Sequence, residues 1–186
     1  MIKLIIYIIE DMIHIVYKEK LISTVLKNCI QKGYIFDKEI FIQEFNKIIK
    51  KEKIKSKLFG DNITIVNNGY FKVSDMFFLE NIFNDLGFIK IEFLNITELL
   101  PVMDAIFVEV NNNYLVIYLD NPLYLDMEYF KDIPKIINYL KSFFNKDIAF
   151  FGLNKCIPSI KVNGVNIYYL ENYDKYITQS LLKVKK

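Results

Sequence analysis

The side chains that could carry out chemistry are few and lie scattered along the 186 residues. The only histidine, His14, lies between Ile13 and Ile15, where a histidine is far more often structural than a general base. Cys29 and Cys156 have no cysteine or histidine at metal-ligand spacing, so we expect buried thiols in a reducing compartment. The sequence therefore does not predict nucleophilic catalysis.

Acidic residues near the predicted strand ends offer one catalytic alternative, a metal-dependent nuclease of the ribonuclease H type. The candidates are Glu10, Asp11, Asp104, Glu109 and Asp120. Glu10, Asp11 and Asp120 also fit ordinary turns, and Asp104 fits a solvated strand start. Only Glu109 lies inside a predicted strand, so turns are favoured and no metal site is expected.

Phosphate binding by backbone amides needs glycines that let a phosphate approach the main chain. The six glycines are all isolated: Gly33, Gly60, Gly69, Gly87, Gly152 and Gly164. The absence of GxG and GG pairs excludes a P-loop and a dinucleotide fingerprint. The chain also has no arginine, so bidentate guanidinium recognition of phosphate is excluded.

Lysines form one concentrated run near the end of a predicted helix. Its members are Lys47, Lys50, Lys51, Lys53, Lys55 and Lys57. Lysines there favour the helix dipole, so a solvated helix end is the ordinary interpretation. The functional alternative is contact with an anionic membrane surface or an acidic partner. No aromatic residue lies in the run before Phe59, so single-stranded nucleic acid fits poorly.

Composition predicts a soluble, cytoplasmic protein with a large core. The hydrophobic fraction is 53%, the aromatic fraction is 16%, and the net charge of +2 is too small to argue for nucleic acid. The apolar run at 4–9 is stopped by Glu10, so it is too short for a signal peptide or a membrane span.

The first half of the chain predicts an antiparallel three-strand meander followed by helix, strand, helix and strand. The expected elements are strands at 4–9, 12–17, 21–26, 62–66 and 88–94, a helix begun by Asp37, a helix capped by Ser74 and closed by Gly87, and a helical turn ending at Pro101. The residues expected on the core faces of the helices are Phe41, Phe45, Ile48, Ile49, Phe78, Leu79, Ile82, Phe83 and Leu86.

The same order begins again in the second half. The expected elements are strands at 105–110, 114–119, 123–125, 148–151 and 165–170, a hairpin turn at 111–113, a helix at 127–144 that Pro134 should kink, and a closing helix at 173–182. The recurrence predicts an α/β fold of two lobes, 1–102 and 103–186. Each lobe should have a mixed sheet begun by an antiparallel meander and flanked by helices.

Two successive lobes of this order resemble the actin-like superfamily, with its ribonuclease H-like fold, and most of all its bacterial MreB, FtsA and PilM branch. Residues 32–37 are similar to the entry of the family's early helix, and 81–88 to a helix ending in Gly-Phe. Residues 107–111 resemble the second phosphate loop, and 151–160 the adenosine motif.

The sequence departs from the family pattern where the nucleotide should bind. The first phosphate loop has Tyr7 to Ile9 in place of Asp-x-Gly, and the second has Asn111 in place of glycine. Glu109 stands where the family has a Mg²⁺-organising aspartate, and the adenosine motif keeps only Gly152. The expectation is a pseudo-ATPase without a cofactor, which is not an enzyme.

The resemblance implies a non-catalytic binding or scaffold protein of a cytoplasmic assembly for cell shape, division or pilus formation. A protein partner is expected, and self-association and a peripheral membrane contact stay open. One alternative is the non-catalytic partner subunit of the threonylcarbamoyl-adenosine tRNA-modifying complex, although only 68–71 weakly echoes its sequence. The nuclease is a second alternative. The segment 173–186 is expected to pack as a final core helix rather than bind membrane.

Overall fold

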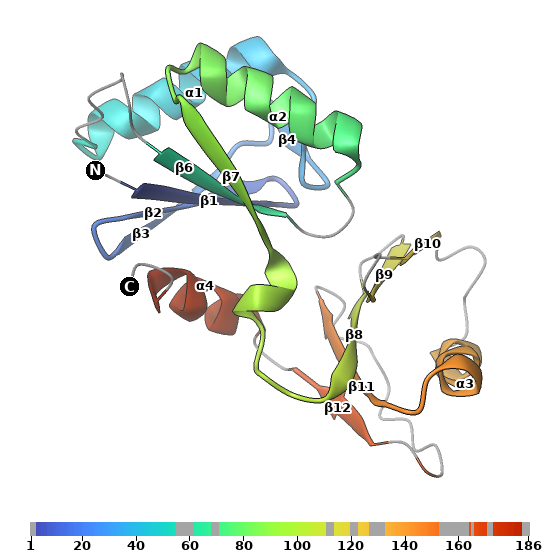
Figure 1. Ribbon diagram of the computed structural model, residues 1–186. Helices are drawn as coiled ribbons and strands as arrows, with labels where there is room; N and C mark the ends of the chain where they lie inside the picture. Colours follow the sequence, from blue (N-terminus) through green and yellow to red (C-terminus); the bar gives the residue numbers. More distant parts are fainter. Residues whose placement is uncertain are drawn as a thin grey trace. The chain divides into compact units, whose positions relative to one another are not determined.

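The computed structural model describes residues 3–54, 62–67, 71–110, 114–119, 123–126, 133–152, 164, 166–170 and 173–183. The chain divides into two units (Figure 1): the first runs to Glu98 and includes the residues from Thr178 onward, and the second spans Leu99–Ile177. The end of the chain thus groups with the first unit rather than with the predicted lobe 103–186. The boundary falls within the closing helix α4 (Tyr173–Lys183), of which Thr178–Lys183 belongs to the first unit and Leu181 is fully buried.

The first unit contains a five-stranded sheet in the order β3-β2-β1-β6-β7. Its strands are β1 (Lys3–Ile9), β2 (Met12–Tyr17), β3 (Lys20–Val25), β6 (Asn62–Asn67) and β7 (Lys90–Asn95). The first three pair antiparallel, as predicted, whereas β6 runs parallel to β1 and β7 runs parallel to β6. Parallel neighbours need helical crossovers, and the two helices of the unit supply them.

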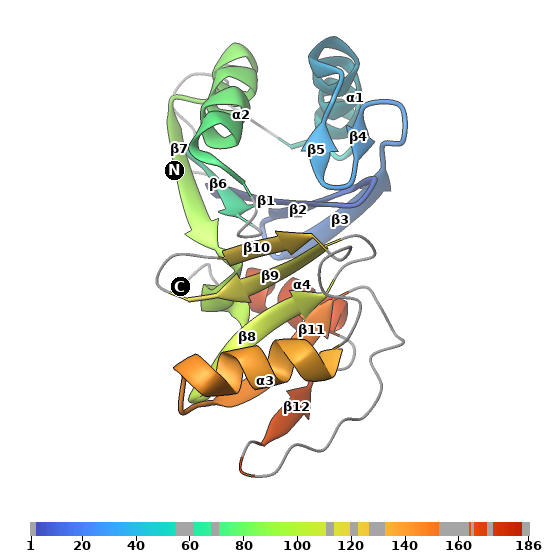
Figure 2. The same cartoon turned by 90° about the vertical axis from the view of Figure 1, so that its right-hand side faces the viewer.

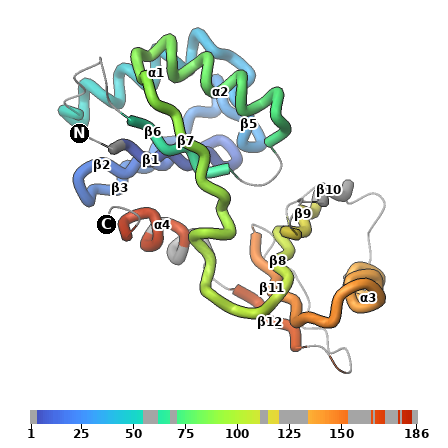
Figure 3. Tube along the Cα trace, viewed as in Figure 1, coloured from blue at the N-terminus to red at the C-terminus, as the bar shows by residue number. Residues whose placement is uncertain are grey.

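The helices α1 (Lys38–Lys51) and α2 (Val73–Asp85) lie side by side on one face of this sheet (Figures 1 and 2). Phe41 and Phe45 of α1 and Phe83 of α2 form an aromatic cluster with Phe88, which follows α2, and neighbouring ring centroids lie 5.7 to 6.4 Å apart. The C-terminal half of α4 lies on the other face of the sheet in the tube view (Figure 3).

Helix α1 begins as predicted. Asp37 has an extended backbone, and its carboxylate accepts a hydrogen bond from the Ile40 amide at 3.0 Å. One of the amides that a helix start leaves without an intrahelical partner is therefore satisfied.

Replacing Asp37 by alanine is expected to lower the free energy of unfolding by about 1 kcal/mol, because the Ile40 amide loses its acceptor. Urea denaturation measures this change. Asp37→Asn is the matched control, since asparagine caps helices about as well. Equal losses in both variants would contradict a capping role.

The predicted cap of α2 is wrong, and its predicted end is confirmed. Ser74 does not cap the helix: the N-cap is Lys72, whose amide donates to the Asp75 carboxylate at 2.7 Å. A carboxylate one turn into the helix reaches back to the cap more readily than a serine inside it. At the other end Gly87 has φ 91°, and the Phe88 amide donates to a carbonyl of the last turn.

Two further features of the first unit differ from the prediction. A short hairpin of β4 (Ile30–Gln31) and β5 (Tyr34–Ile35) precedes α1 and was not predicted, because two-residue strands carry no periodicity. Phe78 was placed on the core face of α2 but is 42% exposed, since it lies to one side of the buried stripe of Leu79, Ile82 and Phe83. A 3₁₀ turn, η1 (Ile96–Leu99), follows β7, near the turn expected before Pro101.

The second unit repeats the strand order of the first, as β10-β9-β8-β11-β12. Its elements are β8 (Ala105–Val110), β9 (Tyr114–Tyr118), β10 (Leu123–Asp126), α3 (Ile133–Phe143), β11 (Asp147–Gly152) and β12 (Ile167–Tyr169). β8, β9 and β10 pair antiparallel, and β11 and β12 are parallel to β8. Pro134 lies in the first turn of α3, where a missing amide costs little. Two predictions lie outside the described residues: the turn at 111–113 and the helical conformation of 127–132.

The core of the second unit lies between α3 and one face of its sheet. Ile106, Val108 and Val110 of β8 point to this face, where Ile136 and Leu140 of α3 pack against them. Because side chains alternate along a strand, Phe107 and Glu109 point to the opposite face. Among the described residues, no helix is long and apolar enough to span a membrane.

Candidate functional site

The turn between β1 and β2 directly follows Tyr7 to Ile9, the segment to which the resemblance assigns the first phosphate loop. It consists of two residues, Glu10 and Asp11, because the strands stay paired up to Ile9 and Met12. The Glu10 carbonyl accepts from the Gly33 amide at 2.8 Å, and the Asp11 carbonyl accepts from the Leu26 amide at 2.7 Å. The turn also carries two carboxylates, which repel a phosphate, and that of Asp11 pairs with Lys27 at 3.7 Å.

Tyr7, the first predicted loop position, is a core residue of β1. Its buried ring stacks on His14 of β2 with centroids 5.8 Å apart, and His14 Nδ1 lies 2.8 Å from Ser23 Oγ of β3. The three residues form a row across paired strands. His14 is therefore engaged in sheet contacts, as its apolar neighbours predicted. Ile9 is also buried.

Glu109 lies on the face of the second sheet that is turned away from α3, and it is only 1% exposed. The Tyr118 hydroxyl donates a hydrogen bond to its Oε2 atom at 2.6 Å. Phe151 stacks on the Tyr118 ring with centroids 5.8 Å apart, and it meets Phe107 edge-on at 6.4 Å. A carboxylate held by a tyrosine among aromatic rings is a poor ligand for a hydrated Mg²⁺ ion, which keeps several waters.

Gly152, the one glycine kept from the adenosine motif, is required by the packing of β11 against β8. Its φ is +138°, and a Cβ atom added to it would lie 2.1 Å from the Val110 carbonyl oxygen. No side chain fits in that space, and that backbone conformation is essentially restricted to glycine. This glycine is therefore explained without a nucleotide. Asn111, the remaining loop position, lies outside the described residues.

The acidic candidates for a nuclease do not converge in the described part of the chain. Asp104 and Glu109 lie at opposite ends of β8, about 16 Å apart at 3.3 Å per residue. Asp104 pairs with Lys146 at 3.1 Å, and Asp11 pairs with Lys27 at 3.7 Å. No group of three metal-ligating side chains occurs among the described residues, which exclude Asp120.

The remaining candidates have structural roles or lie outside the described residues. Cys29 is buried as predicted, its Sγ lies 3.6 Å from the Leu26 carbonyl oxygen, and burial raises the pKa of its thiol. Phe71 is the one described residue of 68–71, the segment that weakly resembles the partner subunit of the tRNA-modifying complex. It is buried, and its ring centroid lies 6.0 Å from that of Tyr34. Cys156 and residues 68–70 are outside the described ranges.

The lysine run lies at the C-terminal end of α1. Lys47, Lys50, Lys51 and Lys53 are exposed, and Lys47 pairs with Glu44 at 2.6 Å. Lys55 and Lys57 lie outside the described residues. Reasoning from the sequence missed that Lys18 of the β2–β3 turn and Lys20 of β3 join this end of the unit. Lys20 forms an ion pair with Glu52, the C-cap of α1, and Lys18 lies two residues before Lys20.

The strand order of both sheets, with α1, α2 and α3 on the described crossovers, defines the class: this chain has the actin-like fold. No known protein-family model and no curated protein matches the sequence. Among solved structures, the chain is similar to the cytoplasmic domain of EpsL, an inner membrane component of the type II secretion system of Vibrio cholerae. That match has a TM-score of 0.53 at 7% identity and covers 100% of this chain and 96% of the other.

Two further structures match over most of this chain. The ethanolamine utilization protein EutJ from Carboxydothermus hydrogenoformans matches with a TM-score of 0.52 and 11% identity, over 82% of this chain and 76% of EutJ. A Bacteroides thetaiotaomicron protein with actin-like ATPase fold has a TM-score of 0.49 and 12% identity, over 98% of this chain and 95% of its own. At these identities the likeness to EpsL and EutJ shows the fold alone.

Proposed function

We propose that this chain is a non-catalytic binding or scaffold subunit of a cytoplasmic assembly of the cell-shape, division or pilus type, and that it does not bind nucleotide. The observation that carries the proposal is the β1–β2 turn. A loop that binds phosphate offers amides to the ligand, whereas this turn offers the carboxylates of Glu10 and Asp11.

The aromatic packing around Glu109 supports the same conclusion. Phe107, Tyr118 and Phe151 contact one another on the face of the sheet that carries Glu109. Since Tyr118 holds one carboxylate oxygen, the residue is used for internal hydrogen bonding. A scaffold needs a stable two-unit fold, and these contacts contribute to its stability without a ligand.

The relatives are consistent with a role in an assembly. EpsL is a component of a secretion system, by the description of its structure. Similarity of fold transfers function poorly, so we rest the proposal on the site. A fold that has lost its ligand site keeps its outer surfaces, and these can bind partners.

Isothermal titration of the full chain with Mg²⁺-ATP is expected to show no saturable heat up to about 1 mM nucleotide, a limit that corresponds to about 4 kcal/mol of binding free energy. A nucleotide-binding actin-like ATPase under the same conditions is the positive control. Saturable binding in the micromolar range, or turnover of ATP, would exclude the proposal.

A further inference from the structure

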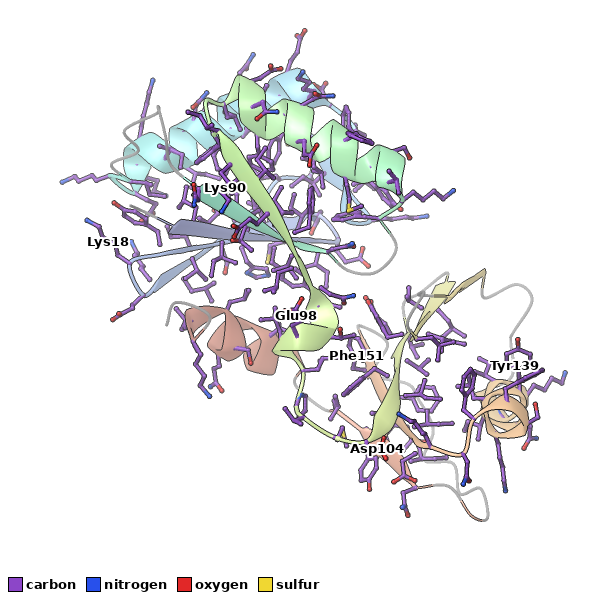
Figure 4. All side chains as sticks on the ribbon, in the orientation of Figure 1. Lys18, Lys90, Glu98, Asp104, Tyr139 and Phe151 are labelled. Atoms are coloured by element: carbon purple, nitrogen blue, oxygen red, sulfur yellow. The ribbon has the colours of Figure 1, made fainter. Side chains whose placement is uncertain are left out.

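We propose that the basic end of the first unit, formed by Lys18, Lys20, Lys50, Lys51 and Lys53, binds the surface of an anionic membrane. The five lysines come from two segments: the β2–β3 turn with the first residue of β3, and the last turn of α1 with the residue beyond its cap. The ion pair between Lys20 and Glu52 joins the two segments. Figure 4 shows Lys18 at the tip of its turn, where it extends from the sheet.

The charge of this end is strongly positive. Lys50, Lys51 and Lys53 are exposed and have no ion-pair partner among the described residues, and neither does Lys18. The described acidic residues in the two segments are Glu19 and Glu52, and Glu52 is already engaged. The hydrogen bond from Lys20 lowers the pKa of the Glu52 carboxyl, so this link persists at neutral pH.

The backbone of this end identifies two lysines that can be replaced without strain. Lys18 has φ 46° and Lys53 has φ 51°, the left-handed region that glycine and asparagine prefer. Lys18 and Glu19 form a two-residue hairpin turn for which Asn-Gly is the favoured pair. Lys53 follows the cap of α1, where the Ile54 amide bonds to the Ile49 carbonyl at 3.0 Å and where glycine is usual. Lys18 and Lys53 thus stand at positions where glycine is unstrained, so both can be replaced by glycine without disturbing the backbone.

The chemistry of the end favours a lipid surface over other anions. A nucleic acid or an acidic peptide carries fixed charges that favour bidentate groups or stacking. The chain has no arginine, and the described residues of this end include no exposed aromatic residue. Lysines are flexible point charges, and the head groups of a fluid bilayer move to meet them. This inference goes beyond the proposed function, because none of these lysines belongs to the degenerate nucleotide loops.

The test is co-sedimentation of the full chain with vesicles of about 30% phosphatidylglycerol in phosphatidylcholine, a composition that gives a negative surface potential. We expect binding that falls as salt is raised and that is absent with pure phosphatidylcholine. Each lysine near the surface contributes roughly fivefold to partitioning, so Lys18→Gly/Lys53→Gly should lower it about 25-fold. Glycine relieves the strained φ at both positions, so this variant is expected to fold at least as stably as the parent.

The matched control is Lys32→Gly/Lys72→Gln, which removes the same charge. Lys32 also has a positive φ, 51°, but it lies in the β4–β5 hairpin, whose Gly33 bonds to Glu10 at the opposite end of β2. We expect its partitioning to stay within about twofold of the parent, since its charges lie outside the basic end. The proposal would be overturned if both variants lost partitioning equally or if the parent did not bind anionic vesicles. It would also be overturned if poly-glutamate or DNA displaced the vesicles at low concentration. Nucleotide binding is measured in a separate titration. The membrane proposal and the proposed function can therefore fail independently of each other.

Discussion

Replacing Phe83 by alanine is expected to lower the free energy of unfolding of the first unit by about 4 kcal/mol. The Phe83 ring is fully buried, and it meets the rings of Phe41, Phe45 and Phe88 edge-on at 6.0, 5.7 and 6.1 Å. Truncation removes these contacts and leaves a cavity between α1 and α2 that rigid neighbouring rings cannot fill.

Urea denaturation followed by far-UV circular dichroism measures this loss, since the chain has no tryptophan to report on it. Phe77→Ala is the matched control on the same helix, where the ring is 60% exposed. The control is expected to change stability by no more than about 0.5 kcal/mol. A Phe83 variant as stable as the Phe77 variant would show that this cluster is not the core of the unit.

Replacing Gly152 by alanine is expected to lower the free energy of unfolding of the second unit by about 3 kcal/mol. The new methyl group would meet the Val110 backbone, whose oxygen lies 2.1 Å and whose nitrogen lies 2.8 Å from the ideal Cβ position. Strand β11 would have to move away from β8, and the hydrogen bonds between these two strands would weaken.

Gly164→Ala provides the comparison for this effect. Gly164 also has a positive φ, +79°, but the nearest atom to an added Cβ is Lys141 Nζ at 3.6 Å. Only the backbone strain remains there, which costs about 1 kcal/mol. The measurement is thermal and urea unfolding without nucleotide. If Gly152→Ala is no worse than Gly164→Ala, the close approach to Val110 does not explain why this glycine is present.

Most of the fold followed from the sequence because its signals are local. β-Branched runs broken by charged pairs predicted β1 to β3, and the spacing of Phe41 and Phe45 predicted α1. The resemblance implied the actin-like fold, whereas local pattern gives no strand order within a sheet. The capping error at Ser74 arose because Asp75 offers a stronger acceptor to the Lys72 amide, a choice that depends on one turn of geometry.

The site was predicted less completely than the fold, for reasons of distance along the chain. The missing glycines indicated that a phosphate loop is absent, but the bond from Gly33 to Glu10 and the close approach of Gly152 to Val110 join distant residues. Likewise, the lysine run was visible as a run, whereas its extension by Lys18 and Lys20 depends on one ion pair between β3 and the cap of α1. No periodicity in the sequence predicts contacts between residues so far apart along the chain.

The return of α4 to the first unit has a consequence for synthesis on the ribosome. Because residues from Thr178 onward belong to that unit, it stays unfinished until all of Leu99–Ile177 has been translated. Domains usually fold in order as they emerge, N-terminal first. Here the first unit cannot complete its fold until the residues from Thr178 onward are synthesised. One face of its sheet stays exposed to chaperones until then.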